Sequence, residues 1–163
     1  MQTKLVVNGV AAIALLVAGC GGTGTGRYGS GASSSPSPAA TAETIAVATN
    51  AKLGQILVDD KGMTVYLFVA DSGTASTCYT SCAAIWPPVV TTGAPQVGAG
   101  AQTSLLGTTT RTDGKVEVTY AGHPLYYFVQ DKKAGDTTGQ GVNGFGALWW
   151  VLSPSGAAIQ VKP

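Results

Sequence analysis

The sequence has little of what most enzyme active sites use: among 163 residues there is one histidine, and charged residues make up 10%. That histidine, His123, is the only possible base for Ser-His-Asp or Cys-His catalysis, and no Gly-x-Ser-x-Gly elbow precedes any serine. Zinc clusters, phosphate-binding loops, calcium loops and dinucleotide fingerprints are also missing from the sequence. A hydrolase-like enzyme is therefore the least favoured class, no catalytic residue is predicted, and no cofactor is predicted.

The sequence also lacks an excess of charge of one sign. From Glu43 onward the Lys and Arg residues nearly balance the Asp and Glu residues, and only the pair Lys132-Lys133 is locally basic. Nucleic-acid-binding surfaces carry a clustered excess of basic charge. The sequence therefore predicts no nucleic-acid partner.

The N-terminal segment has the layout of a bacterial lipoprotein signal. Lys4 precedes an apolar run, residues 5–17, which ends in Val17-Ala18-Gly19-Cys20. The run is shorter than the roughly 20 residues of a membrane-spanning helix, and small residues before a cut are typical of secretory signals. The segment resembles a lipobox, which implies that residues 1–19 are removed and that Cys20 becomes a lipidated first residue, anchored to the membrane on the extracytoplasmic face. The alternative is an ordinary signal peptide with a cysteine near its cleavage site.

A change in composition then separates a tether from a folded domain. Residues 20–43 are mostly Gly, Ser, Thr, Pro and Ala, a segment that cannot bury enough apolar surface to offset its ordering entropy. We expect a flexible tether there and a folded domain over residues 44–163, which is long enough for its own core.

The domain contains an internal repeat with an offset of sixty residues. Glycines, aromatics and an aspartate coincide, and each unit closes with tryptophan followed by aliphatic residues, in IWPPVV and LWWVL. The identical pairs are Gly54 and Gly114, Val58 and Val118, Gly62 and Gly122, Tyr66 and Tyr126, Phe68 and Phe128, Val69 and Val129, and Asp71 and Asp131. We assign repeat one to residues 54–90 and repeat two to residues 114–152. Two copies suggest a pseudo-twofold domain, since a solenoid needs more.

The local patterns are those of strands. β-Branched and aromatic runs flank the turn DDKG in repeat one and the turn AG in repeat two. Residues 63–69 are apolar on both faces, with Val65, Leu67 and Val69 on one and Tyr66 and Phe68 on the other, which indicates a central strand. Residues 89–111 are expected to link the repeats, with one short strand at 103–106. The predicted fold class is mainly β, a single domain of two pseudo-symmetric repeats with short helical turns at most.

These features together resemble a known family. Tyr66-x-Phe68-x-x-Asp71, Cys78-x-x-x-Cys82 and Trp86-Pro87-Pro88 are followed by Tyr126-x-Phe128-x-x-Asp131, Gly135-Asp136, Gly139-Gln140-Gly141 and Trp149-Trp150. This order is similar to that of the bacterial secreted-repeat lipoproteins marked by a Tyr-x-aromatic-x-x-Asp motif. The resemblance implies a tandem-repeat lipoprotein of the cell envelope, with no established catalytic activity.

The repeated motif has a structural interpretation and a functional one. Tyr66 and Phe68, like Tyr126 and Phe128, point to one face of a strand and can pack on the tryptophan that closes their unit. Asp71 and Asp131 can then accept backbone N–H groups of the turns that follow, SG and KKAG. In the alternative, the two carboxylates meet across the pseudo-twofold axis to bind a cation or to act as an acid and base pair.

Two further sets of residues are candidates for chemistry. Cys78 and Cys82 are an even pair in an exported protein and are predicted to form a structural disulfide. His123 and Met63 occupy nearly equivalent turns and are candidate copper ligands. The predicted function is a lipid-anchored, extracytoplasmic, non-catalytic binding or envelope-associated module. The alternative is a copper-binding or redox lipoprotein that uses His123, Met63 and the cysteine pair.

Overall fold

The chain reverses direction at the same glycine in both repeats. Gly62 and Gly122 have φ values of +80° and +82°, a left-handed conformation that glycine adopts without the steric cost of a Cβ atom. Both turns are taken from the computed structural model of the protein, which describes residues 41–161. The predicted signal peptide 1–19, Cys20 and most of the predicted tether lie outside the described residues.

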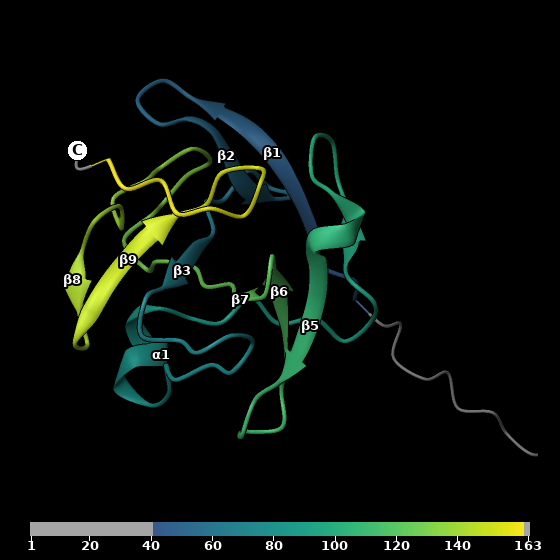
Figure 1. Cartoon of the computed structure of the whole chain (residues 1–163), viewed down its shortest axis with the longest axis vertical. Coiled ribbons are helices and arrows are strands. Elements are labelled where there is room, and N and C mark those ends of the chain that lie inside the picture. The colour runs from purple at the N-terminus through teal and green to yellow at the C-terminus, as the bar shows by residue number, and fades with distance from the viewer. Residues whose placement is uncertain (1–40, 162–163) are drawn as a thin grey trace, which may run out of the picture. The chain divides into compact units, whose positions relative to one another are not determined.

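Short strands dominate the described part of the chain, so the mainly β fold class is confirmed (Figure 1). The elements are β1 (Thr44–Asn50), β2 (Gly54–Asp59), β3 (Tyr66–Phe68), α1 (Ser81–Ile85), β4 (Gln96–Val97), η1 (Thr103–Leu105), β5 (Leu106–Thr110), β6 (Val116–Tyr120), β7 (His123–Pro124), β8 (Asn143–Gly144) and β9 (Ala147–Val151). The only helical segments among residues 41–161 are the short α1 and the 3-10 turn η1.

The strands form three small sheets, ordered β2-β1-β4, β3-β9-β8 and β5-β6-β7. An antiparallel hairpin opens each repeat: β1 with β2, and β5 with β6. The short strand β4 lies parallel to β1, with Gln96 opposite Thr44. One edge of the first sheet is therefore β4, and one edge of the third is β5.

The two repeats exchange their closing segments. In repeat one, β3 pairs with β9 of repeat two, which places Phe68 opposite Trp149. Reciprocally, Tyr127 of repeat two donates its backbone N–H to the carbonyl of Pro87 at 2.8 Å. Between these two pairings, Tyr66 and Tyr126 each donate a backbone N–H to the other's carbonyl, at 2.8 and 3.0 Å. The pseudo-twofold axis thus passes between two tyrosines of the repeated motif.

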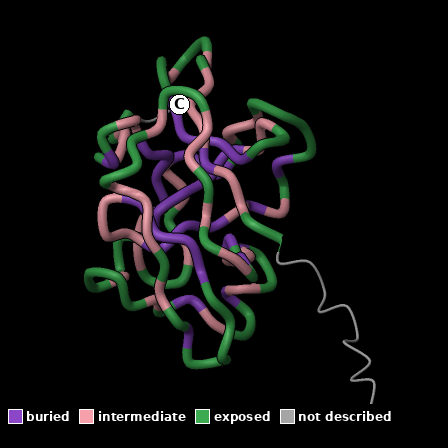
Figure 2. Tube along the Cα trace, turned by 90° about the vertical axis from the view of Figure 1, so that its right-hand side faces the viewer, coloured by how far each residue is buried: buried purple, intermediate pink, exposed green. Residues whose placement is uncertain are grey.

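Both faces of β3 and β9 are covered, as a central strand requires. One core cluster contains Tyr66, Phe68 and Trp149, and the other contains Leu67 and Trp150. Figure 2 shows the buried segments running through the interior and the exposed residues gathered on the outer turns. Val69, which the sequence places on a covered face, is 53% exposed because β3 ends at Phe68.

The segment between the repeats is more ordered than the sequence suggests. Residues 103–105, where a strand is expected, form η1, and the strand β5 begins only at Leu106. At the other boundary, the last residues of the predicted tether are tied to the domain: Thr41 and Thr92 exchange hydrogen bonds, and Glu43 donates its N–H to the Thr91 hydroxyl. These contacts hold the entry to β1 beside residues 91–92.

Candidate functional site

The repeated motif joins the two repeats through side-chain hydrogen bonds. The phenol of Tyr66 donates to Asp131 Oδ2 at 2.6 Å, and the phenol of Tyr126 donates to Asp71 Oδ2 at 2.7 Å. Each tyrosine therefore contacts the aspartate of the other repeat. Burial raises the pKa of both phenols well above the usual range for tyrosine, and the nearby carboxylates raise it further. Both tyrosines are thus neutral donors at physiological pH.

The second oxygen of each aspartate binds a threonine further along the chain. Asp71 Oδ1 accepts the backbone N–H and the hydroxyl of Thr77, each at 2.7 Å. Asp131 Oδ1 accepts the same two groups of Thr138. The carboxylates accept backbone N–H groups, as expected, but not from the turns SG and KKAG. In the second turn, the N–H groups of Lys132 and Lys133 instead donate to Asp136.

The motif aromatics form one continuous stack across the axis. Phe68 stacks on Trp149 at 4.1 Å, Trp149 on Trp86 at 4.0 Å, and Trp86 on Phe128 at 4.1 Å between ring centroids. The expectation that each phenylalanine packs on the tryptophan of its own unit is wrong, because the closing segments are exchanged and bring the other repeat's tryptophan opposite. The tyrosines do contact their own tryptophan, edge to face: Tyr66 on Trp86 and Tyr126 on Trp149.

A comparison with protein families identifies these two halves. The model of a family described as a secreted repeat of unknown function matches residues 47–90 and again residues 107–153. The chain belongs to this secreted-repeat family. No curated protein and no solved structure matches the chain significantly. Each matched segment begins earlier than the predicted starts at 54 and 114, because it includes part of the first strand of a hairpin, β1 or β5.

Within the secreted-repeat fold, one Tyr-Asp pair is extended by a buried ion pair. Arg111 Nη1 lies 2.8 Å from Glu117 Oε2, and neither side chain is accessible to solvent. Arg111 also donates to the Ser76 hydroxyl and to the carbonyl of Cys78, at 2.6 Å each. Ser76 in turn contacts the phenol of Tyr126 at 2.7 Å. The network therefore runs from Glu117 to the pair formed by Tyr126 and Asp71.

Glu117 is buried in this network, and within residues 41–161 only one of its two carboxyl oxygens is hydrogen-bonded. Burial raises its pKa to about 7, against the opposing effect of the hydrogen bond and charge of Arg111. Its second oxygen, Oε1, has no hydrogen-bond partner among the described residues. The sixty-residue offset places Ala51 and Leu57 at the positions of Arg111 and Glu117, so the ion pair breaks the pseudo-symmetry.

The predicted disulfide is present. Cys78 and Cys82 are bonded, with their Cα atoms 5.2 Å apart, and both are buried. The bridge closes the turn that leads into α1, and α1 leads to Trp86. Because the Cys78 carbonyl accepts a hydrogen bond from Arg111, the bridge and the ion pair hold the same segment.

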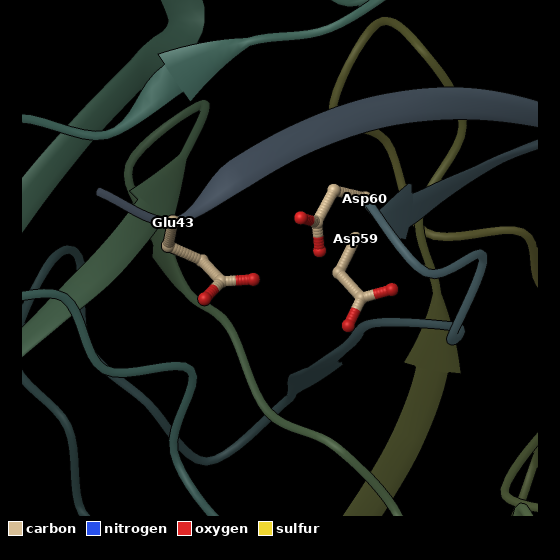
Figure 3. A group of neighbouring side chains, drawn as sticks. All are labelled: Glu43, Asp59 and Asp60. Carbon is tan, nitrogen blue, oxygen red and sulfur yellow. The ribbon is translucent and has the colours of Figure 1, made fainter. Parts of the chain in front are cut away.

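A second group of carboxylates lies where β1 begins and β2 ends (Figure 3). Ligand atoms of Glu43, Asp59 and Asp60 lie within 4.8 Å of one another. The phenol of Tyr127 lies 3.0 Å from Glu43 and 3.1 Å from Asp59, and Asp59 also accepts the N–H groups of Lys61 and Met63. Burial is the largest of the effects that raise the pKa of Glu43. Asp59 thus has both oxygens engaged, and the Tyr127 phenol links it to Glu43.

The two candidate copper ligands lie in different surroundings. Met63 lines a pocket of about 390 Å³ together with Tyr127 and Glu43, and His123 is not among the residues that line it. His123 is half-buried in β7, where it pairs with Tyr120. Copper binding by Met63 and His123 stays a prediction to be tested by metal titration.

Sequence reasoning missed Arg111, Glu117, Ser76 and Tyr127. Arg111 is the last residue of the segment expected to link the repeats, and no motif marks Glu117. The available signal was the position of Glu117 within the strand pattern KVEVTY, between Val116 and Val118. The backbone of residues 89–91 pairs with β6 on the side away from β5, which places β6 inside the sheet, and Arg111, which is held by Ser76 and Cys78, contacts the Glu117 side chain.

Proposed function

We propose that this protein is anchored to the membrane by a lipid on Cys20 and that its folded part acts outside the cytoplasm as a non-catalytic binding module. Membership of a secreted family supports export. The sequence Val17-Ala18-Gly19-Cys20 supports acylation of the cysteine thiol. No described helix is long and apolar enough to cross a membrane.

The observation that carries the non-catalytic assignment is the use of the motif's polar groups. Every oxygen of Asp71 and Asp131 accepts a hydrogen bond from a tyrosine or a threonine of the domain. A general acid or base must present its carboxyl to a substrate proton, whereas these carboxylates are engaged by groups of the domain itself. The motif therefore supports the architecture of the module, and binding is expected elsewhere on it.

The anchor can be tested by fractionation. The variant Cys20→Ser should release the protein from the membrane fraction or leave it unprocessed, because serine offers no thiol for the diacylglyceryl group. As a matched control, Cys82→Ser should remain lipid-labelled and membrane-bound. Mature Cys20→Ser protein that stays fully in the membrane fraction and still incorporates labelled fatty acid would refute the anchor.

A further inference from the structure

Two sheet edges border the same hollow on the domain. A pocket of about 810 Å³ is lined by Gln96 and Val97 of β4 and by Leu106, Gly107 and Thr108 of β5. Both strands are at the ends of their sheets. An edge strand carries a row of backbone N–H and C=O groups that are available to another strand.

The backbone of β5 can be oriented from its neighbours. In β6, the N–H of Val118 donates to Val89 and its C=O accepts from Leu125, so both groups point away from β5. Thr108 is opposite Val118 in the antiparallel ladder. In an antiparallel pair, two opposite residues either both point their N–H and C=O groups at each other or both point them away from each other. The N–H and C=O of Thr108 therefore point away from β6, to the open edge, and the same argument applies to Thr110, opposite Val116.

The backbone of β4 presents its free groups in the same way. The N–H groups of Gln96 and Gly98 donate to the carbonyls of Glu43, just before β1, and Ile45 in β1. Val97, between them, therefore turns its N–H and C=O away from β1. Thr108 and Val97, which both line the hollow, thus direct their backbone groups away from β6 and β1.

The lining of the hollow is uncharged throughout. It consists of threonine, glycine, alanine, proline, glutamine, valine and leucine. A charged ligand would find no counter-ion there, whereas an extended peptide would find backbone partners along its edge and small side chains beneath it. Addition of a strand to a free edge is an established mode of peptide recognition.

We propose that this hollow binds an extended, uncharged segment of a partner protein, which adds to β5 as a further strand. The inference rests on the proposed role of the domain as a binding module and names the chemistry of its partner. A single extended strand is the smallest occupant that can pair with the β5 edge within a hollow of about 810 Å³. Pairing with a second copy of this chain is an alternative outcome of the test below.

The probe is a displayed library of heptapeptides built only from Ala, Gly, Ser, Thr, Val and Gln, selected on the full-length exported protein. Enriched peptides are synthesised and titrated into isotope-labelled protein. The largest amide shifts should fall at Val97, Thr108 and Thr110. Binding should change by less than about twofold between low and high salt, because no charge pair is involved.

Matched variants test the backbone contact. Thr108→Pro removes the outward N–H at an edge position, where proline is tolerated. The affinity for the peptide should fall by about tenfold, the effect of roughly one hydrogen bond. Thr108→Val keeps the N–H and should bind like the unchanged protein. A peptide N-methylated at alternate residues should also lose binding, which keeps the test valid if Thr108→Pro does not fold.

Several outcomes would overturn the proposal: no peptide enriched above the Thr108→Pro background, shifts that fall elsewhere, or equal weakening by Thr108→Val. Self-association that shifts the amide resonance of Thr108 when no peptide is present would assign the edge to a second copy instead. Binding measured on Cys20→Ser protein separates this inference from the anchor, since a failed anchor leaves the peptide result unchanged.

Discussion

At the residue scale, a phenol and a carboxylate join the halves of the molecule twice. Tyr66 binds Asp131, and Tyr126 binds Asp71. A buried acceptor left without its donor costs about 1 to 3 kcal/mol. The motif is therefore repeated because each copy supplies the donor for one pair and the acceptor for the other.

The pairing predicts which double-mutant cycle shows coupling. Tyr66→Phe and Asp131→Ala remove the two partners of one bond, so their effects on the free energy of unfolding should be non-additive by about 1 kcal/mol. Tyr66→Phe combined with Asp71→Ala, from the same repeat, should be additive. Chemical denaturation of the single and double variants measures both. Coupling within a repeat and none between repeats would contradict the crossed arrangement.

The stacked rings predict large losses on truncation. Phe68→Ala and Phe128→Ala should each lower the free energy of unfolding by about 3 to 5 kcal/mol, because each leaves a cavity against a tryptophan. Val69→Ala, at an exposed neighbouring position, serves as the control and should change little. Thermal and urea unfolding give the values. Wild-type stability of both phenylalanine variants would mean that the stack is not part of the core.

Glu117 predicts a pH dependence of stability. Its pKa is about 7 in the folded protein against an ordinary value of 4.5, so the folded state binds the proton more tightly than the unfolded state does. The stabilisation is full below about pH 4.5 and is lost as the pH rises to about 7. We expect a decrease of about 2 to 3 kcal/mol over this window, from roughly 1.4 kcal/mol per pKa unit.

The variant Glu117→Gln checks this assignment, because glutamine does not titrate. Urea unfolding at several pH values should show a flatter profile for the variant than for the unchanged protein. Glu43→Gln is the control: the pKa of Glu43 is also raised, but this residue lies at the other carboxylate group. An equally steep profile in Glu117→Gln would assign the pH dependence to another residue.

At the scale of elements, the sequence predicts what is local and misses what depends on the partner strand. The glycine turns, the disulfide and the two-faced strand follow from neighbouring residues, although the strand is predicted over residues 63–69 and is found only at 66–68. The stacking of Phe68 on Trp149 does not, because it depends on which closing segment pairs with β3. A sixty-residue repeat is compatible with either choice, within a repeat or between repeats.

The same limit explains the asymmetric features. Arg111 precedes a turn, and only the fold shows that its side chain donates hydrogen bonds to Ser76 and Cys78. β5 consists of Leu-Gly-Thr-Thr-Thr and lacks the aromatic residues of β3. Its strand conformation comes from pairing with β6 along its whole length. Tertiary pairing therefore decides the structure of the segment that was expected to be a linker.

At the scale of the whole molecule, the exchanged segments predict that neither half folds alone. A chain cut between Gly100 and Ala101 leaves β3 without β9 and Tyr127 without Pro87. Each half should be unfolded by circular dichroism, and an equimolar mixture should regain the tryptophan signal and a cooperative melt. A half that melts cooperatively by itself would contradict the interdependence of the repeats.

The exchange also bears on how such a domain arises by duplication. If a chain with a single repeat kept this exchanged pairing, it would take the closing segment from a second molecule, and a twofold dimer is the closed way to do so. Fusion of the two copies then places both segments at a fixed high local concentration. Once they are joined, the two copies can diverge in sequence. The ion pair of Arg111 and Glu117, which is present in only one half, is such a difference.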